Sequence, residues 1–207
     1  MYLKIFVFSL AVFSASALPF LDWIKYFKPP YMPLKIGSCK FNTYKTDFKP
    51  DLFFTGKWHG LMSSGNFLLQ AGGICGTMVS EIKGDEANVL NYQYEPMVGK
   101  YIHLRGVVNV TEIQMSNYYI KYDFISGLRS IDIPITVLGT DYNHFAVLYS
   151  CQEAFGLVAE RSWIATRSPG DTRSLDQIKH IVEVAGLNFN DFEKQEAIKC
   201  PPNPPTI

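Results

Sequence analysis

Apolar and polar residues alternate along much of the chain, in short runs that are separated by turn-forming residues. The clearest run begins at Tyr118, where Tyr118, Ile120 and Tyr122 fall on one side of an extended chain and Lys121 and Asp123 on the other. Such runs recur about every 8–15 residues, without intervening helices, and this spacing predicts an all-β antiparallel barrel or sandwich. The predicted strands are residues 55–61, 74–82, 87–95, 101–113, 118–124, 133–138, 143–151 and 157–166.

The period of the apolar residues changes near the C-terminal end of the chain. Leu175, Ile178, Ile181, Val182 and Ala185 recur three or four residues apart, as on one side of an α-helix. This pattern predicts one amphipathic helix that packs its apolar side on the outside of the strands.

Residues 1–17 have the pattern of a secretory signal peptide. A short start that contains Lys4 precedes an apolar run over residues 5–13, and Ala15-Ser16-Ala17 provides a small-residue cleavage site. The apolar run is too short to span a bilayer, and no later run is long enough for a membrane helix. The sequence therefore predicts a secreted, extracellular protein without a transmembrane segment; the alternative is that residues 1–17 form a buried strand or helix.

Residues 18–38 combine aromatic side chains with prolines at 19, 29, 30 and 33. Proline interrupts helices and central strands, so we expect an extended arm that precedes a single domain over residues 39–207. Two interpretations of the arm remain open. Its aromatic residues cover the domain, or they contact a protein partner, a second copy of the chain or a membrane surface.

Charge and cysteine content limit the classes of partner. The chain has 19 basic and 19 acidic residues and no concentrated basic segment, which argues against nucleic-acid binding. The four cysteines are an even number in an exported chain and predict disulfides. The residue pattern alone leaves all three pairings open. It contains neither a C-x-x-C pair nor a pair of histidines at metal-ligand spacing, so no metal site is expected.

Three short motifs occur in a fixed order: Gly56-Lys57-Trp58, Thr140-Asp141-Tyr142, and residues 163–167, which read Trp-Ile-Ala-Thr-Arg. With the strands between them and the helix after them, they resemble the lipocalin family, and most closely its arthropod bilin-binding, insecticyanin and crustacyanin members and its apolipoprotein D-like members. The resemblance covers roughly residues 39–200. It implies an eight-stranded antiparallel up-and-down barrel with one C-terminal helix outside, which holds a small apolar ligand. His59 departs from the pattern, because most of these relatives have an aromatic residue after the tryptophan.

The resemblance also implies roles for individual residues. Arg167 would lie across the ring of Trp58 at the closed end of the barrel, and Cys39–Cys151 and Cys75–Cys200 would be the disulfides. The residues expected to form this barrel floor are Gly56, Trp58, Thr140, Asp141, Tyr142 and Arg167. In apolipoprotein D-like members a tryptophan at the spacing of Trp163 faces the ligand; the alternative for Trp163 is a core position without a ligand.

Strand alternation extends the expected ligand site beyond Trp163. If Cys75 and Cys151 point outward to their disulfides, the residues at odd offsets from them point into the barrel. The expected ligand-binding residues are Trp163, Arg161, Met78, Ser80, Leu148 and Ser150. The same alternation turns His144 inward near the floor, where it is either a hydrogen-bonded interior residue or a ligand for haem.

No arrangement of residues predicts catalysis. The sequence lacks G-x-S-x-G, H-E-x-x-H and P-loop motifs, and Cys75, which could serve as a nucleophile, is expected to be oxidised. Asn109-Val110-Thr111 is a glycosylation sequon. Two interpretations remain open: Asn109 is glycosylated, or the tripeptide occurs by chance. We expect a secreted carrier, not an enzyme, which requires no cofactor and binds a bilin, carotenoid, retinoid or fatty-acid-like molecule. The alternative is an interaction or structural protein that uses its outer surface and the arm.

Overall fold

The structure is a computed structural model, and it describes residues 34–39, 45–65, 73–124 and 129–207. The expectations for the signal peptide at 1–17 and for the arm up to residue 33 lie outside this part of the chain. Within it, no helix is long and apolar enough to cross a membrane.

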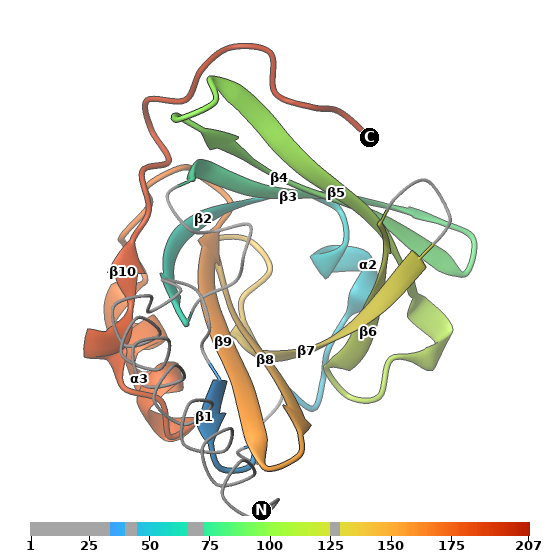
Figure 1. Ribbon diagram of the computed structural model, residues 1–207, viewed down its shortest axis with the longest axis vertical. Helices are drawn as coiled ribbons and strands as arrows, with labels where there is room; N and C mark the ends of the chain where they lie inside the picture. The colour runs from blue at the N-terminus through green and yellow to red at the C-terminus, as the bar shows by residue number, and fades with distance from the viewer. Residues whose placement is uncertain (1–33, 40–44, 66–72, 125–128) are drawn as a thin grey trace, which may run out of the picture. The chain divides into compact units, whose positions relative to one another are not determined.

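Eight long strands form a closed antiparallel barrel, which Figure 1 shows along its axis. Each strand pairs with the next in sequence, and β2 also pairs with β9, which closes the ring. The strands are β2 (Gly56–Ser64), β3 (Ile74–Lys83), β4 (Glu86–Glu95), β5 (Lys100–Asn109), β6 (Asn117–Phe124), β7 (Arg129–Thr140), β8 (Phe145–Ala154) and β9 (Leu157–Thr166). The predicted fold class is therefore confirmed.

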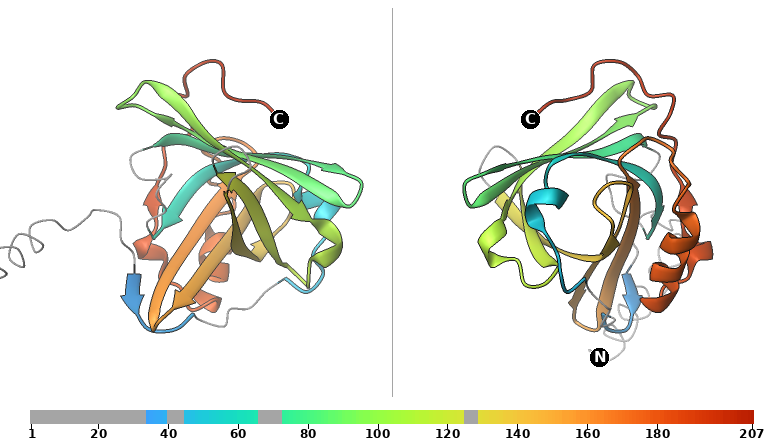
Figure 2. Two further views of the ribbon diagram at one scale, coloured as in Figure 1. Left: turned by 45° about the vertical axis from the view of Figure 1, so that its right-hand side comes forward. Right: turned by 180° about the vertical axis from the view of Figure 1, so that it is seen from behind.

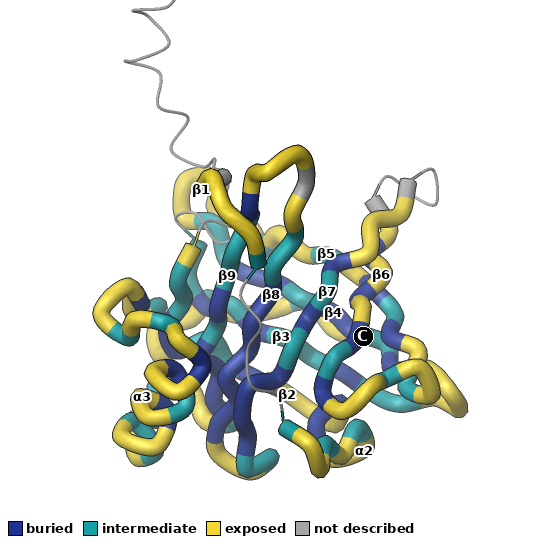
Figure 3. Tube along the Cα trace, turned by 90° about the horizontal axis from the view of Figure 1, so that it is seen from below, coloured by how far each residue is buried: buried dark blue, intermediate teal, exposed yellow. Residues whose placement is uncertain are grey.

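Alternation along β6 shows how the sequence builds this wall. Tyr118, Ile120 and Tyr122 are buried inside the barrel, whereas Tyr119 and Lys121 are exposed. Figure 3 shows buried positions concentrated along the strands. Burial of one side of each strand is the main stabilising contribution to such a sheet.

A second apolar core lies between the outside of the barrel and helix α3 (Leu175–Val184), which lies beside the barrel in Figure 2. Ile178 and Val182 are fully buried there. Gly139 on β7 allows the close approach, because a Cβ at this position would lie 2.7 Å from Ile181. The predicted outer helix is present where the apolar spacing placed it.

Several short elements were not predicted. They are β1 (Leu34–Ile36), α2 (Pro50–Phe53), the 3-10 turns η1 (Val110–Glu112) and η2 (Phe189–Asp191), and β10 (Glu193–Lys194). Strand β1 pairs with β9, so the described sheet begins inside the segment expected to be an arm, before Cys39. The strand expected over 101–113 ends at Asn109, where the chain turns into η1.

Candidate functional site

The closed end of the barrel is built around Trp58 and Arg167. The guanidinium carbon of Arg167 lies 3.7 Å from the centroid of the Trp58 ring, a cation–π contact. The guanidinium also donates hydrogen bonds to the backbone carbonyls of Leu52, Thr55, Lys57 and Tyr142, at 2.6–3.1 Å. Arg167 therefore joins the chain before β2 to the loop after β7 and satisfies carbonyls that the strands leave unpaired.

The Thr140-Asp141-Tyr142 motif forms the tight loop between β7 and β8. One oxygen of Asp141 accepts the backbone N–H groups of Asn143, His144 and Phe145. Burial opposes ionisation of this carboxyl, but these donors and the His144 ring outweigh it and hold the pKa of Asp141 below its ordinary value. The motif is a fixed part of the floor.

His144 does not point into the barrel, contrary to the expectation from strand alternation. Its ring is half-exposed, and Nδ1 lies 2.7 Å from a carboxylate oxygen of Asp141. The reason is that β8 begins at Phe145, so His144 still belongs to the loop, where alternation does not apply. No described histidine lines the barrel cavity, so the described wall offers no imidazole to a haem iron.

Helix α2 contributes aromatic rings to the floor that sequence reasoning missed. Phe53 and Phe54 are fully buried, and their ring centroids lie 5.5 Å from Trp58 and 5.1 Å from Tyr118, respectively. The indole N–H of Trp58 donates to the carbonyl of Phe53 at 2.9 Å. The Phe53-Phe54 pair, one residue before the Gly56-Lys57-Trp58 motif, was the signal that could have indicated these floor residues.

Above the floor, the barrel contains a partly open cavity of about 140 Å³. Most of its wall is apolar, and Trp58 lies at its base. The described residues that line it are Trp58, Gly60, Gly76, Thr77, Met78, Asn91, Tyr92, Gln93, Ile102, Leu104, Tyr118, Ile120, Tyr122, Ile133, Ile135, Leu148, Trp163, Ala165 and Gln195.

Three of the six expected ligand-binding residues line this cavity: Met78, Leu148 and Trp163. Ser80, Ser150 and Arg161 do not. Ser80 faces Gly56 at the level of the floor, and the pairing of Ser150 with Arg161 places both beyond Trp163 along their strands. Strand alternation predicts which residues point into the barrel. It does not predict how far along the barrel axis the cavity extends.

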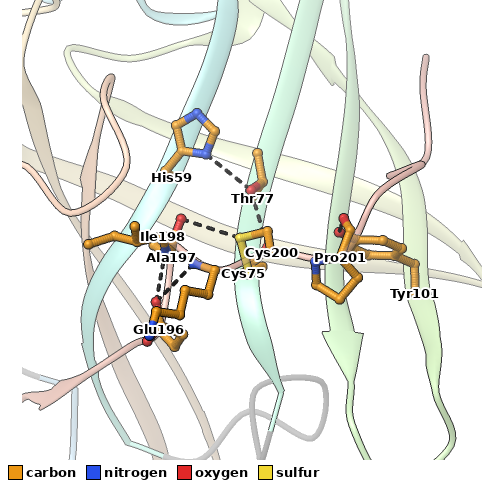
Figure 4. Close-up of a disulfide and its surroundings, with 10 residues drawn as sticks. His59, Cys75, Thr77, Tyr101, Glu196, Ala197, Ile198, Cys200 and Pro201 are labelled. Atoms are coloured by element: carbon orange, nitrogen blue, oxygen red, sulfur yellow. Dashed lines mark hydrogen bonds between the residues drawn. A yellow bond between two sulfur atoms is a disulfide. The ribbon is translucent and has the colours of Figure 1, made fainter.

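The cavity wall contains a gap between β2 and β3. These strands pair only from Gly56 to His59, and β10 then takes the place of β3 beside β2. Beyond β10, the Cys75 N–H donates to the Glu196 carbonyl at 2.6 Å, and the Cys75–Cys200 disulfide fixes the segment to β3 (Figure 4). The side chain of Gln195 fills the gap and lines the cavity.

Local glycines make room for Gln195. A Cβ on Gly60 would lie 2.2 Å from its side-chain oxygen, and one on Gly76 would lie 3.3 Å from the same atom. An irregularity in the β3–β4 pairing at residues 74–77 turns both Gly76 and Thr77 toward the cavity. A lone glutamine in the tail carries no sequence signal for this role.

Neutral polar groups interrupt the apolar wall. Asn91 donates its amide N–H to the Tyr122 hydroxyl, and Gln93 and Tyr118 are both buried. Burial raises the pKa of Tyr118 and Tyr122, so both phenols stay protonated. None of the described lining residues carries a charge.

Both disulfides implied by the resemblance are present: Cys39 is bonded to Cys151, and Cys75 to Cys200. The sequon residue Asn109 is exposed at the end of β5, and its side chain accepts the Thr111 N–H. No group of three potential metal-binding side chains occurs among the described residues.

Comparison with known proteins agrees with this geometry. Apolipoprotein D of Macaca fascicularis is 22% identical and the match covers 81% of this chain and 86% of that protein. Insecticyanin from the tobacco hornworm Manduca sexta superposes with a TM-score of 0.68 at 18% identity, over 79% of this chain and 88% of the other. The amine-binding protein of Rhodnius prolixus, solved as a tryptamine complex, superposes with a TM-score of 0.63 at 18% identity, over 77% and 86%.

A family model described as Nitrophorin matches residues 39–205, which is most of the chain. The match includes all eight barrel strands, the outer helix and both disulfides. The chain therefore belongs to the nitrophorin family and is a lipocalin.

Proposed function

We propose that this protein is a secreted carrier that binds a small hydrophobic molecule inside its barrel. The observation that carries the proposal is the cavity above the Trp58 floor, which apolar side chains of β6 to β9 line on one side. Burial of an apolar ligand against such a wall removes its surface from water, which is the main source of affinity in sites of this kind. Ile133, Leu148 and Trp163 would form part of that contact.

Several features support secretion. Residues 1–17 have the pattern of a signal peptide, and two disulfides suit an oxidising compartment. Asn109 is exposed in a turn, where a glycan would have room. We therefore keep Asn109 as a proposed glycosylation site.

The cavity volume bears on the proposed ligands. An engineered apolar cavity of about 150 Å³ holds benzene, and the cavity here is of similar size, at about 140 Å³. This favours a ligand with a ring and short substituents over an extended bilin or carotenoid held entirely inside. The tryptamine named for the Rhodnius prolixus protein is a ligand in this smaller range.

Carriage is a better proposal than catalysis. Cys75 on β3 is the candidate nucleophile, but its sulfur is bonded to that of Cys200. A disulfide sulfur has no thiolate with which to attack a substrate. The role of residues 18–38 as a partner surface or an oligomer contact stays a separate proposal, since this arm lies largely outside the described residues.

The test is an absorption spectrum and mass analysis of the protein purified from its natural source. A co-purifying small apolar molecule, released by organic solvent and rebound by the emptied protein, is the expected result. A visible absorption band would identify it as a pigment. An empty protein that binds no retinoid, bilin, fatty acid or small aromatic compound would overturn the proposal and favour a protein that acts through its outer surface.

A further inference from the structure

We infer that the cavity selects a compact, uncharged ligand with a hydrogen-bonding edge, and that Gln195 of the C-terminal segment recognises this edge. The inference rests on the proposed function and specifies the class of ligand. It differs from what the name of the tryptamine-binding neighbour suggests, because tryptamine carries an ammonium group at neutral pH.

The described part of the cavity wall is uncharged. The described lining residues include no Asp, Glu, Lys, Arg or His. A buried ammonium or carboxylate would lose its hydration without gaining an opposite charge, which disfavours charged ligands strongly. Arg161 is the cationic side chain that strand pairing places nearest Trp163, and it does not line the cavity.

The cavity wall contains polar side chains, and one of them is buried without a partner in the described residues. Gln93 is 7% exposed, and it adds a polar side chain to the cavity wall. The Tyr118 hydroxyl is the buried group without a partner in the described ranges, and its ring lines the cavity. Buried polar groups in folded proteins are nearly always hydrogen-bonded, so such a group beside a cavity indicates a polar ligand group.

Hydrogen bonds fix the orientation of Gln195. Its Nε2 donates to the Ser63 hydroxyl at 3.0 Å, so the amide orientation is set, and Oε1 lies over Gly60 and Gly76 in the gap of the wall. The backbone is fixed as well, because the Gln195 N–H donates to the Leu61 carbonyl at 2.9 Å. Oε1 is thus an acceptor held ready for a hydroxyl or N–H group of the ligand.

The apolar lining residues indicate the nature of the rest of the ligand. Apolar side chains of β6 to β9 line the cavity together with Gln93 and Gln195; they are Ile120, Ile133, Ile135, Leu148 and Trp163. A ligand with an apolar ring and one neutral donor–acceptor group, such as an alcohol, a phenol or a primary amide, matches both groups of residues.

Three probes of nearly equal size test the inference: 2-phenylethanol, 2-phenylethylammonium and phenylacetate. Binding to the full-length, oxidised protein is measured at neutral pH by calorimetry. We expect the alcohol to bind at least tenfold more tightly than either ion, since neither ion finds a counter-charge in the wall. Ethylbenzene, which lacks the polar group, should bind more weakly than the alcohol.

Two variants test the part assigned to Gln195. Q195L should weaken 2-phenylethanol about fivefold and leave ethylbenzene nearly unchanged, because only the alcohol uses the amide. Q195E should raise the affinity for 2-phenylethylammonium relative to the alcohol, since it adds a negative charge to the wall. Q177L, an equivalent change on the exposed side of α3, is the control and should alter nothing.

Three results would overturn the inference, and they separate it from the proposed function. Tighter binding of either ion by the unmodified protein contradicts the uncharged site. Equal losses for the alcohol and ethylbenzene in Q195L contradict hydrogen bonding by Gln195. Failure of all four probes, together with tight binding of a long-chain lipid or a bilin, contradicts the ligand class but leaves the carrier proposal intact.

Discussion

Polar groups at the closed end of the barrel and on the cavity wall above it differ in how many hydrogen bonds they make within the chain. At the closed end, the Arg167 guanidinium, the Trp58 N–H and the Asp141 carboxylate all have partners within the chain. The Tyr118 ring packs against Phe54 at the edge of the floor and lines the cavity above it, and its buried hydroxyl has no partner in the described ranges. The Ser80 hydroxyl, at floor level and away from the cavity, is also buried without a partner in the described residues. Hydrogen bonds completed within the chain stabilise the fold, whereas an unpartnered group on the cavity wall keeps a hydrogen bond available for a ligand. We therefore expect substitutions at the closed end to change mainly stability, and substitutions around the cavity to change mainly ligand binding.

The largest effects should come from the two disulfides. Each closes a loop of more than a hundred residues, with separations of 112 and 125. Serine at both cysteines of either bridge should lower the free energy of unfolding by about 4–5 kcal/mol in the chain-entropy account. Urea unfolding followed by intrinsic fluorescence measures this loss.

Ligand binding should distinguish the two bridges. Loss of Cys75–Cys200 frees the segment that carries Gln195 and should weaken 2-phenylethanol several-fold, whereas loss of Cys39–Cys151 should leave its affinity unchanged. Equal affinities in the two folded variants would show that the Cys75–Cys200 bridge does not position Gln195 for binding.

Replacement of Arg167 comes next in size. R167A removes the cation–π contact with Trp58 and leaves several backbone carbonyls without donors, so we expect a loss of about 2–3 kcal/mol. R167K should recover less than half of it, because an ammonium cannot reproduce the planar donor set. Chemical denaturation of both variants is the measurement, and a neutral R167A would contradict the floor's contribution to stability.

Trp163 should respond to a bound ligand more strongly than Trp58. Trp163 lines the upper wall, while Trp58 is 1% exposed and held by Arg167. A bound ligand should change tryptophan emission by some tens of per cent, and W163F should lose most of this change while its stability falls by about 1 kcal/mol or less. A ligand response that W163F retains would place the ligand away from Trp163.

The smallest expected effect is a pH dependence of the floor. The pKa of Asp141 is lower in the folded protein than its ordinary value of 3.8. Its contribution to stability is therefore present above about pH 4 and is lost as the pH falls through the folded pKa. D141N should show a weaker decline in urea midpoint between about pH 5 and pH 3, compared with a D123N control on the exposed side of β6. Parallel declines in the two variants would contradict a special role for Asp141.

Much of the fold could be predicted because it depends on local periodicity. Alternation along residues 118–124 and helical spacing from Leu175 reflect which side of each element is buried, and both predictions agree with the structure. The errors lie where alternation stops. His144 lies one residue before β8, and the chain after Asn109 has already left β5.

The candidate site was only partly accessible to such reasoning. Strand parity selected Met78, Leu148 and Trp163, which line the cavity, but also Ser80, Ser150 and Arg161, which have the same parity and lie elsewhere along their strands. Gln93 and Gln195 were missed, because polar residues in a strand and a tail have no pattern that marks them as facing a cavity.

The sequence by itself determined the strands, the outer helix and, through its three motifs, the family and the Trp58–Arg167 floor. The strands and the helix depend on side-chain periodicity. The floor depends on Trp58 and Arg167, which both belong to the three motifs. Only the tertiary structure decided where the cavity begins, which strands separate, and that Gln195 enters the gap between β2 and β3. These features result from contacts between segments more than a hundred residues apart, such as that of Gln195 with Ser63. The pattern of neighbouring residues does not indicate which distant segments come into contact.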